Sequence, residues 1–304
     1  MRISPKKKTQ IEKPATKIPV LISYAYLRKA APEIIEWWAS QPELEVIVDS
    51  GAYTAWASGD PIDVADYIAW LKDWGHRFWR YFALDVVKEP KPTRQNLFKM
   101  WDAGLDPVPV HVFGEDEAWM NELYEHTDFI AVVIRQQMGD PDSFIRRVLP
   151  LKMQWAAGRK VHWFGYTNHK QITKWKPYSC DTSSWASGTF FGTAKVYYGK
   201  GRWKAFCHAD TINGPMPKIL GEALREYGYS YEKAQDANLW KRVISQGLES
   251  DEFIPHWITV NSWIKFVRDI KKHFGTDLYL ALLPASWSDN ELVFRAFSGQ
   301  KGRC

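Results

Sequence analysis

Three apolar runs of the chain each end in an aspartate: Glu45-Val-Ile-Val-Asp49, Tyr81-Phe-Ala-Leu-Asp85 and Tyr178-Ser-Cys-Asp181. A short buried strand that stops on a carboxylate is typical of a (β/α) barrel, whose active site lies at the carboxyl ends of the strands. Several acids at one barrel mouth favour chemistry carried out by carboxylates. The residues that follow each aspartate differ, which allows each acid a separate role.

Strands and helices alternate along most of the chain, and apolar runs predict eight strands, at 19–24, 46–48, 81–87, 107–114, 129–134, 160–165, 179–181 and 277–283. Eight strands alternating with helices is the count of a TIM-type barrel. A doubly wound open sheet shows the same local alternation, but the Gly-rich turn usual after its first strand is missing. We therefore predict an α/β fold, a TIM-type (β/α)8 barrel with a late insertion subdomain.

The barrel pattern is interrupted late in the chain. Residues 193–206 predict a hairpin in which basic and aromatic residues alternate, and residues 217–247 look helical and polar. We expect four segments: a flexible basic arm (1–17), the first seven β/α units (18–187), an insertion with the hairpin and helices (188–255), and the last helix and strand closing the barrel (256–304).

Composition excludes several classes of protein. The 304 residues carry a net charge of +5, which permits a polyanion partner. The three cysteines, Cys180, Cys207 and Cys304, form no spaced pair, so neither a disulfide framework nor a four-cysteine zinc site is predicted. No apolar stretch has membrane-spanning length, and residues 1–17 lack the apolar core of a signal peptide. We expect a cytoplasmic protein without metal, cofactor or membrane partner.

Each aspartate has a structural alternative. Asp49, in Asp-Ser-Gly-Ala-Tyr, suits a site for a planar heterocycle, or else only caps the following turn. Asp85 matches the N–H donors of a guanine edge, or else forms an ion pair with Lys88 or Arg94. Asp181 suits a nucleophile that attacks an anomeric carbon, or else a cap within Asp-Thr-Ser-Ser.

Other candidate residues carry weaker signals. Gly165 follows a predicted strand, and its backbone together with Thr167 suits a pocket wall, although a tight turn explains both. The single histidines His111, His162 and His169 have no HxH or HExxH spacing, so a metal hydrolase is disfavoured.

Five motifs occur in one order: 48–53 (VDSGAY), 82–85 (FALD), 110–115 (VHVFGE), 164–167 (FGYT) and 180–185 (CDTSSW). With them the chain resembles the tRNA-guanine transglycosylase superfamily over roughly residues 45–190. It is most similar to the phage branch, the queuine tRNA-ribosyltransferase-like DNA guanine transglycosylases of the DpdA type. These enzymes exchange guanine in DNA for a 7-deazaguanine such as preQ0, which protects the phage genome from restriction.

The resemblance implies roles for individual residues. Asp49 resembles the acid that handles the proton of the exchanged base, and Asp181 the nucleophile that attacks C1′. Asp85 resembles the carboxylate that recognises the guanine edge. The remaining positions that the match places in the base pocket are Ser50, Gly51, Tyr53 and the backbone of Gly114. A phage-encoded protein would act in the host cytoplasm.

Two departures from the family concern the substrate. The tRNA enzymes carry a Cys-rich zinc site near the C-terminus, for which this chain has no residues, and their paired-glycine strand is here Ala131-Val-Val-Ile134. Both departures make DNA a better match than tRNA. For the DNA backbone we select the basic residues of the predicted hairpin, which alternate with Tyr and Trp: Lys195, Lys200, Arg202 and Lys204.

The predicted reaction is therefore exchange of guanine in DNA through a covalent aspartyl-sugar intermediate, with the target nucleotide extruded from the helix. Three alternative functions remain open: a tRNA base exchanger of the queuosine or archaeosine type, a nucleoside or nucleotide N-glycosidase in which water is the acceptor, and a DNA-binding barrel without turnover. For the hairpin, the alternative to binding the DNA backbone is an ordinary solvated hairpin.

Overall fold

A computed structural model describes residues 17–134, 142–186, 192–241, 253–284 and 287–299. The chain divides into two compact units. The N-terminal unit comprises Met1–Tyr166 and Pro177–Asp181, and the C-terminal unit comprises Thr167–Lys176 and Thr182–Cys304. Residues 1–16 of the predicted arm, and residues 188–191 and 242–252 of the predicted insertion, lie outside the described residues.

The N-terminal unit is built on parallel strands, which pair in the two runs β1–β2–β3 and β4–β5–β6–β7. Their bounds are β1 Ile18–Ser23, β2 Leu44–Asp49, β3 Arg80–Tyr81, β4 Val110–His111, β5 Phe129–Val132, β6 Lys160–Trp163 and β7 Ser179–Thr182. They belong to an eight-stranded sheet, whose eighth strand, β10 (Asp277–Leu282), is part of the C-terminal unit. The predicted α/β fold with eight strands is confirmed.

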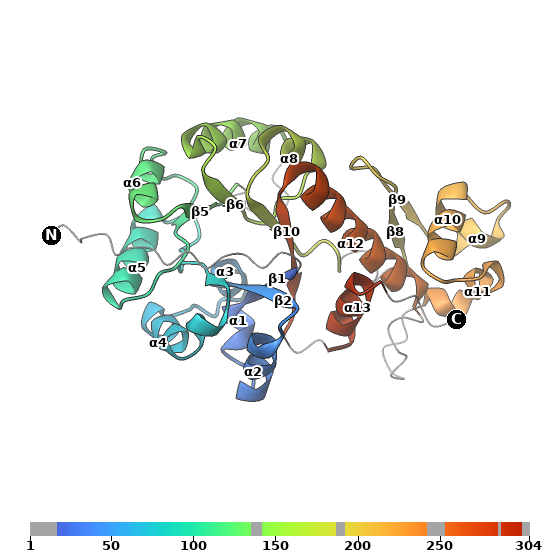
Figure 1. The fold of residues 1–304 in the computed structure, drawn as a ribbon, viewed down its shortest axis with the longest axis horizontal. Coiled ribbons are helices and arrows are strands. Elements are labelled where there is room, and N and C mark those ends of the chain that lie inside the picture. The colour runs from blue at the N-terminus through green and yellow to red at the C-terminus, as the bar shows by residue number, and fades with distance from the viewer. Residues whose placement is uncertain (1–16, 135–141, 187–191, 242–252, 285–286, 300–304) are drawn as a thin grey trace. The chain divides into compact units, whose positions relative to one another are not determined.

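Helices follow the strands of this unit in turn and lie around them (Figure 1). Their bounds are α1 Tyr24–Leu27, α2 Pro32–Ser40, α3 Ala52–Ser58, α4 Val64–Trp74, η1 Gly75–Arg77, α5 Pro90–Asp102, α6 Trp119–His126 and α7 Asp142–Ala156. The apolar strands are buried along almost their whole length, as expected of parallel strands whose two faces are both covered. α4 shows how a helix is positioned: Asp63 caps it through the Ala65 N–H at 2.6 Å, and Tyr67 and Leu71 are buried.

The segments that follow β3 and precede β4 pair through a single parallel β-bridge, between Phe82 and Val108. The Ala83 N–H donates to the Val108 carbonyl at 2.9 Å, and the Val108 N–H donates to the Tyr81 carbonyl at 2.8 Å. The prediction that the strand continues through Val86 and Val87 is wrong. The Val86 N–H donates instead to Thr93 Oγ1 at 2.9 Å, in the turn that leads into α5. Asp85 therefore lies in a loop beyond the strand.

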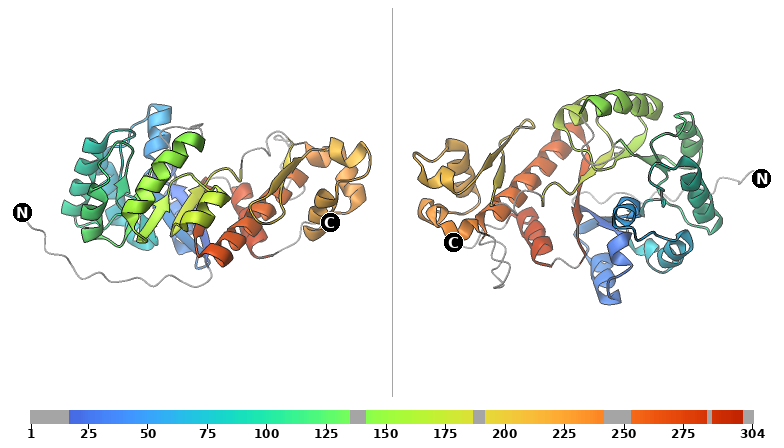
Figure 2. Two further views of the ribbon diagram at one scale, coloured as in Figure 1. Left: turned by 90° about the horizontal axis from the view of Figure 1, so that it is seen from above. Right: turned by 180° about the vertical axis from the view of Figure 1, so that it is seen from behind.

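The C-terminal unit contains the predicted hairpin, which is confirmed: β8 (Ala194–Tyr197) and β9 (Trp203–Phe206) pair antiparallel. Both views in Figure 2 show the hairpin beside the long helix α12 (Ile254–Phe274). The Tyr197 ring lies 5.1 Å from that of Phe266 on this helix. The other helices are α8 His169–Trp175, α9 Ala209–Ile212, α10 Lys218–Glu226, α11 Tyr231–Gln235, η3 Ala237–Trp240 and α13 Trp287–Phe297.

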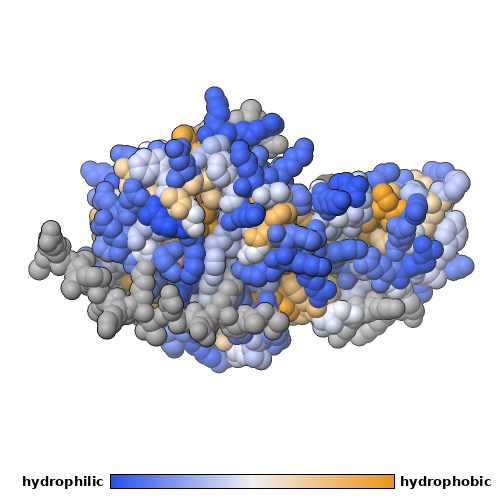
Figure 3. All heavy atoms as spheres, turned by 45° about the horizontal axis from the view of Figure 1, so that its top comes forward, coloured by the Kyte–Doolittle hydropathy of each residue, from blue (hydrophilic) through white to orange (hydrophobic). Residues whose placement is uncertain are grey.

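The face drawn in Figure 3 is mostly hydrophilic, and its hydrophobic residues form small separate patches. Within the described ranges, no helix has both the length and the apolar character needed to cross a membrane. Large apolar side chains that remain exposed are few among the described residues, and two of them, Tyr53 and Trp56, belong to one short helix, α3.

Candidate active site

Asp49 is the last residue of β2 and begins a tight turn into α3. Its Oδ2 accepts a hydrogen bond from the Gly51 N–H at 3.0 Å. Gly51 has a φ of 80°, and a Cβ there would lie 2.6 Å from both Ser23 Oγ and Ala25 Cβ. The turn thus packs directly on the end of β1, which explains the glycine. The capping alternative describes this local hydrogen bond, but Asp49 also interacts with two distant acids.

Asp85 reaches the same region from the loop after β3. Ser50 Oγ donates to Asp85 Oδ1 at 3.2 Å, so the residue next to Asp49 orients the second carboxylate. The ion pairs offered as alternatives are not formed in the described part of the chain. Arg94 Nε binds Glu115 Oε1 at 2.9 Å, and Lys88 Nζ lies 5.7 Å from the centre of the Trp56 ring.

Asp181 is held on β7 by two contacts to one oxygen. The Gly165 N–H donates to its Oδ1 at 2.8 Å, and His162 Nε2 lies 3.2 Å from the same atom. The other imidazole nitrogen, Nδ1, lies 2.8 Å from Ser179 Oγ. His162 is fully buried, and its ring centre lies 4.8 Å from that of Phe82. The carboxylate is therefore fixed from β6 and from its own strand.

Asp49 interacts electrostatically with the other two aspartates. Burial raises the pKa of Asp49 to about 7, and the negative charges of Asp85 and Asp181 add to this rise. Burial also raises the pKa of Asp85 to about 6, opposed by hydrogen bonds to its own backbone and to Ser50. Asp49 and Asp181 from two strand ends thus lie near Asp85 from the loop after β3, and the pKa values of Asp49 and Asp85 are raised towards neutral pH.

The other predicted site residues are distributed more widely. Tyr53 is exposed on α3, and Gly114 is exposed in the loop after β4 with a φ of 87°. Gly165 donates to Asp181, as described above. Thr167 belongs to the C-terminal unit, as do the basic hairpin residues Lys195, Lys200, Arg202 and Lys204. The last three of these are exposed, and Lys195 is half-buried.

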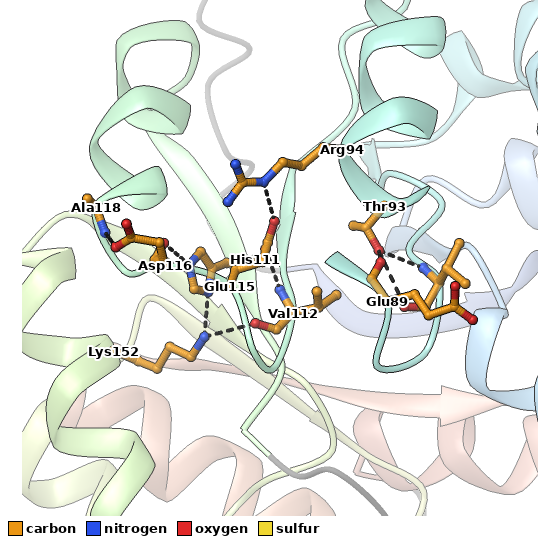
Figure 4. A network of polar contacts seen from close by, with 10 residues as sticks. Glu89, Thr93, Arg94, His111, Val112, Glu115, Asp116, Ala118 and Lys152 are labelled. Atoms are coloured by element: carbon orange, nitrogen blue, oxygen red, sulfur yellow. Dashed lines mark hydrogen bonds and ion pairs between the residues drawn. The ribbon is translucent and has the colours of Figure 1, made fainter. Parts of the chain in front are cut away.

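A buried polar network supports the loop that carries Gly114 (Figure 4). Glu115 Oε2 accepts from the Val112 N–H at 2.9 Å, while its Oε1 binds Arg94. Lys152, from α7, contacts His111 Nδ1 and donates to the Val112 carbonyl at 3.1 Å. Burial lowers the pKa of Lys152 to about 8. Since this network joins β4 to the outer helices α5 and α7, we regard it as a support for the loop.

The sequence did not reveal the contacts that His162 makes with Asp181 or that Lys152 makes with the Val112 carbonyl. His162 lies inside an apolar strand, where a lone histidine is usually a core residue, and its partner Asp181 is remote in sequence. The sequence signal was only that His162 lies three residues before Gly165; that both contact Asp181 is known from the structure. In the described ranges, no three His, Cys, Asp or Glu side chains are grouped so that they could hold a metal ion.

No protein-family model matches the chain, and no curated protein matches it.

Proposed function

We propose that this protein is a guanine transglycosylase that exchanges guanine in DNA for a 7-deazaguanine base, such as preQ0 or a derivative. The observation that carries the proposal is that Asp85 and Asp181 both act electrostatically on Asp49, raising its pKa to about 7 together with burial, while Ser50, next to Asp49, binds Asp85 at 3.2 Å. Base exchange needs a carboxylate nucleophile and a second carboxyl group that gives and takes a proton at neutral pH. The five ordered motifs of the sequence supply the substrate class.

In the first half-reaction an Asp181 oxygen bonds to C1′ of the target nucleotide, and the bond between C1′ and N9 breaks. The electron pair leaves with guanine, which takes a proton from Asp49. Both contacts of Asp181 described above are made to Oδ1, so we assign the attack to Oδ2. In the second half-reaction Asp49 removes the N9 proton of the deazaguanine, N9 attacks C1′, and the ester to Asp181 breaks with net retention.

Asp85 is assigned to recognition of the base. A carboxylate matches the N1–H and exocyclic amine of guanine, and a 7-deazaguanine presents the same pair of donors. Ser50 Oγ, 3.2 Å from Asp85 Oδ1, orients this carboxylate. The raised pKa of Asp85, about 6, follows chiefly from burial, and two N–H donors from a bound base would favour the ionised form.

A closed (β/α)8 barrel is part of the proposal. It is supported by the parallel strands β1 to β7, which neighbour one another in chain order once the Phe82–Val108 bridge is counted between β3 and β4. Closure would gather all strand carboxyl ends around one mouth, as base exchange requires.

DNA is preferred to tRNA because of the two sequence departures from the tRNA enzymes, the missing zinc site and the missing paired glycines. The decisive experiment incubates the protein with DNA, or with tRNA, and labelled guanine. Incorporation of label into DNA supports the proposal, and incorporation into tRNA alone favours the tRNA exchanger. Release of free base without incorporation indicates an N-glycosidase, and binding alone a non-catalytic module.

The matched variants for this experiment are Asp181→Asn, expected to abolish incorporation, and Asp63→Asn, expected to retain it. Asp63 is an exposed cap of α4, and asparagine caps a helix equally well. Full incorporation by the Asp181→Asn variant would refute the assignment of the nucleophile.

A further inference from the structure

Helix α3, which begins three residues after Asp49, exposes two aromatic side chains. Tyr53 is 43% exposed and Trp56 is 54% exposed, and their ring centres lie 5.8 Å apart with the planes tilted by 42°. α3 follows directly on the Asp49 turn, so these rings lie at the carboxyl end of β2. Most large apolar residues of this unit are buried, and a pair of exposed rings on one short helix is available to a ligand.

A lysine completes this surface. Lys88 is exposed in the loop that also carries Asp85, and its Nζ lies 5.7 Å from the centre of the Trp56 ring. Its φ of 64° is the left-handed conformation, which costs a lysine about 1 kcal/mol or more. The loop thus holds a cation next to the rings although the backbone there is strained. We call Tyr53, Trp56 and Lys88 the Trp56 platform.

We propose that the Trp56 platform binds a single-stranded segment of the nucleic acid substrate, stacking the nucleobase next to the exchanged guanine while Lys88 binds a phosphate. This inference rests on the proposed function. Aromatic faces stack on bases of any sequence, which suits the neighbour of a target nucleotide. Three carboxyl groups repel a phosphate backbone, and a cation at the edge of the site offsets that repulsion.

The first experiment measures binding apart from turnover. A DNA oligonucleotide with 2-aminopurine next to the target guanine is titrated with the Asp181→Asn protein, and the titration is repeated with the wild type. Stacking should quench the fluorescent base. Trp56→Ala should weaken binding about 5- to 150-fold and abolish the quenching, which is the effect of losing one stacked base.

The control is Trp155→Ala. Trp155 is a similarly exposed tryptophan, 38% accessible, but it lies near the end of α7, just before β6 begins and so at the opposite end of the strands. This variant should bind the oligonucleotide as the parent does. Equal weakening by both variants, or an unchanged affinity of Trp56→Ala in protein with an unaltered unfolding transition, would overturn the proposal.

A second experiment tests Lys88 through the salt dependence of binding. Lys88→Asn removes the charge with a residue that tolerates left-handed backbone, and should reduce the slope of log K against log salt by about 0.7, the effect of one phosphate contact on a single strand. Lys88→Arg should keep the slope. An unchanged slope in Lys88→Asn would exclude the phosphate contact.

The outcomes separate this inference from the proposed function. Loss of stacking in Trp56→Ala supports the platform even if no base is exchanged, because binding is read without turnover. If the Trp56→Ala variant binds the oligonucleotide normally and still exchanges the base, the proposed function stands and the binding role of the Trp56 platform is refuted. Parallel titrations with RNA of the same sequence distinguish the two nucleic acids, and binding of duplex alone, or of neither, overturns the platform.

Discussion

His162 and Asp181 form a buried pair across the neighbouring strands β6 and β7, with Nε2 of the imidazole 3.2 Å from Oδ1 of the carboxylate. Ser179 Oγ, 2.8 Å from Nδ1, can donate to that nitrogen and so keep the proton on Nε2, where it faces Asp181. The pair therefore occupies Oδ1 of Asp181 and, in the proposed reaction, leaves Oδ2 to attack C1′.

His162 should be a positioning residue for this carboxylate. His162→Ala should lower kcat of base exchange about 10- to 100-fold with little change in KM, because a misplaced nucleophile reacts more slowly after binding. His162→Gln, which can still donate to Asp181, should recover part of the loss. Steady-state kinetics with labelled guanine test this, with the exposed His76→Gln as control. A rise in KM alone would contradict the assignment.

Asp49 should make stability depend on pH. Its pKa in the folded protein is about 7, raised from 3.8, so the folded state keeps a proton that the unfolded state has lost between these values. The free energy of unfolding of the wild type therefore includes a stabilising contribution from Asp49. This contribution is fully present below about pH 4 and is lost as the pH rises towards 7. Asp49→Asn lacks it and should gain stability relative to wild type over this range, measured by urea unfolding.

The control for this series is Asp60→Asn. The pKa of Asp60 is lowered, chiefly by its hydrogen bond to Lys29, so this carboxyl group is ionised in both states above about pH 5. Its difference from wild type should be constant from about pH 5 to 8. A constant difference for Asp49→Asn as well would contradict the shared acidic site.

Asp85 should determine which base is accepted. Asp85→Asn replaces one acceptor by a donor that faces the N–H groups of guanine, and should reduce kcat/KM for guanine by about 100-fold or more. For hypoxanthine, which lacks the exocyclic amine, kcat/KM should fall by a smaller factor in the same variant. Ser50→Ala, which removes only the hydrogen bond to Asp85 Oδ1, should have a smaller effect on guanine. An equal fall in kcat/KM for both bases would show that Asp85 does not recognise the base.

Gly51 should be intolerant of any side chain. In Gly51→Ala the new Cβ would meet Ser23 Oγ and Ala25 Cβ at 2.6 Å, and the φ of 80° adds strain, so we expect about 2–4 kcal/mol of destabilisation. Gly59→Ala has a similar φ of 67° but no heavy atom within 4 Å, and should lose only about 1 kcal/mol. Comparable losses in urea unfolding would show that packing at Gly51 is unimportant.

At alkaline pH, Lys152 should make the free energy of unfolding rise with pH, which is opposite to the effect of Asp49. Its pKa of about 8 lies below the ordinary 10.5, so the unfolded state binds a proton between these values that the folded state does not. Wild-type stability should rise relative to Lys152→Met as pH increases from about 8 to 10. Lys160→Met, at an exposed lysine bound to Asp128, is the control and should show no such trend. Unfolding by urea at several pH values tests the difference.

Much of the fold could be predicted because burial leaves local patterns. β1, β2, β5, β6 and β10 occur within two residues of the apolar runs that predicted them, and the hairpin was recognisable from its glycines. The sequence predicts no helix over Ala52–Ser58, where α3 begins directly after the turn at Asp49. α13 was missed, and β3 proved shorter than predicted because Thr93 binds the Val86 N–H, a contact that no local pattern reveals.

The sequence by itself determined the order of strands and helices and the positions of Asp49 and Asp181 at strand ends, since each depends on a short run of neighbouring residues. Only the tertiary structure decided that Asp49 interacts with Asp85 and Asp181, that His162 holds Asp181, and that Lys88 lies near Trp56. The physical reason is that charge interactions and burial depend on distances through space. Those distances are set by how strands remote in the chain pair in register.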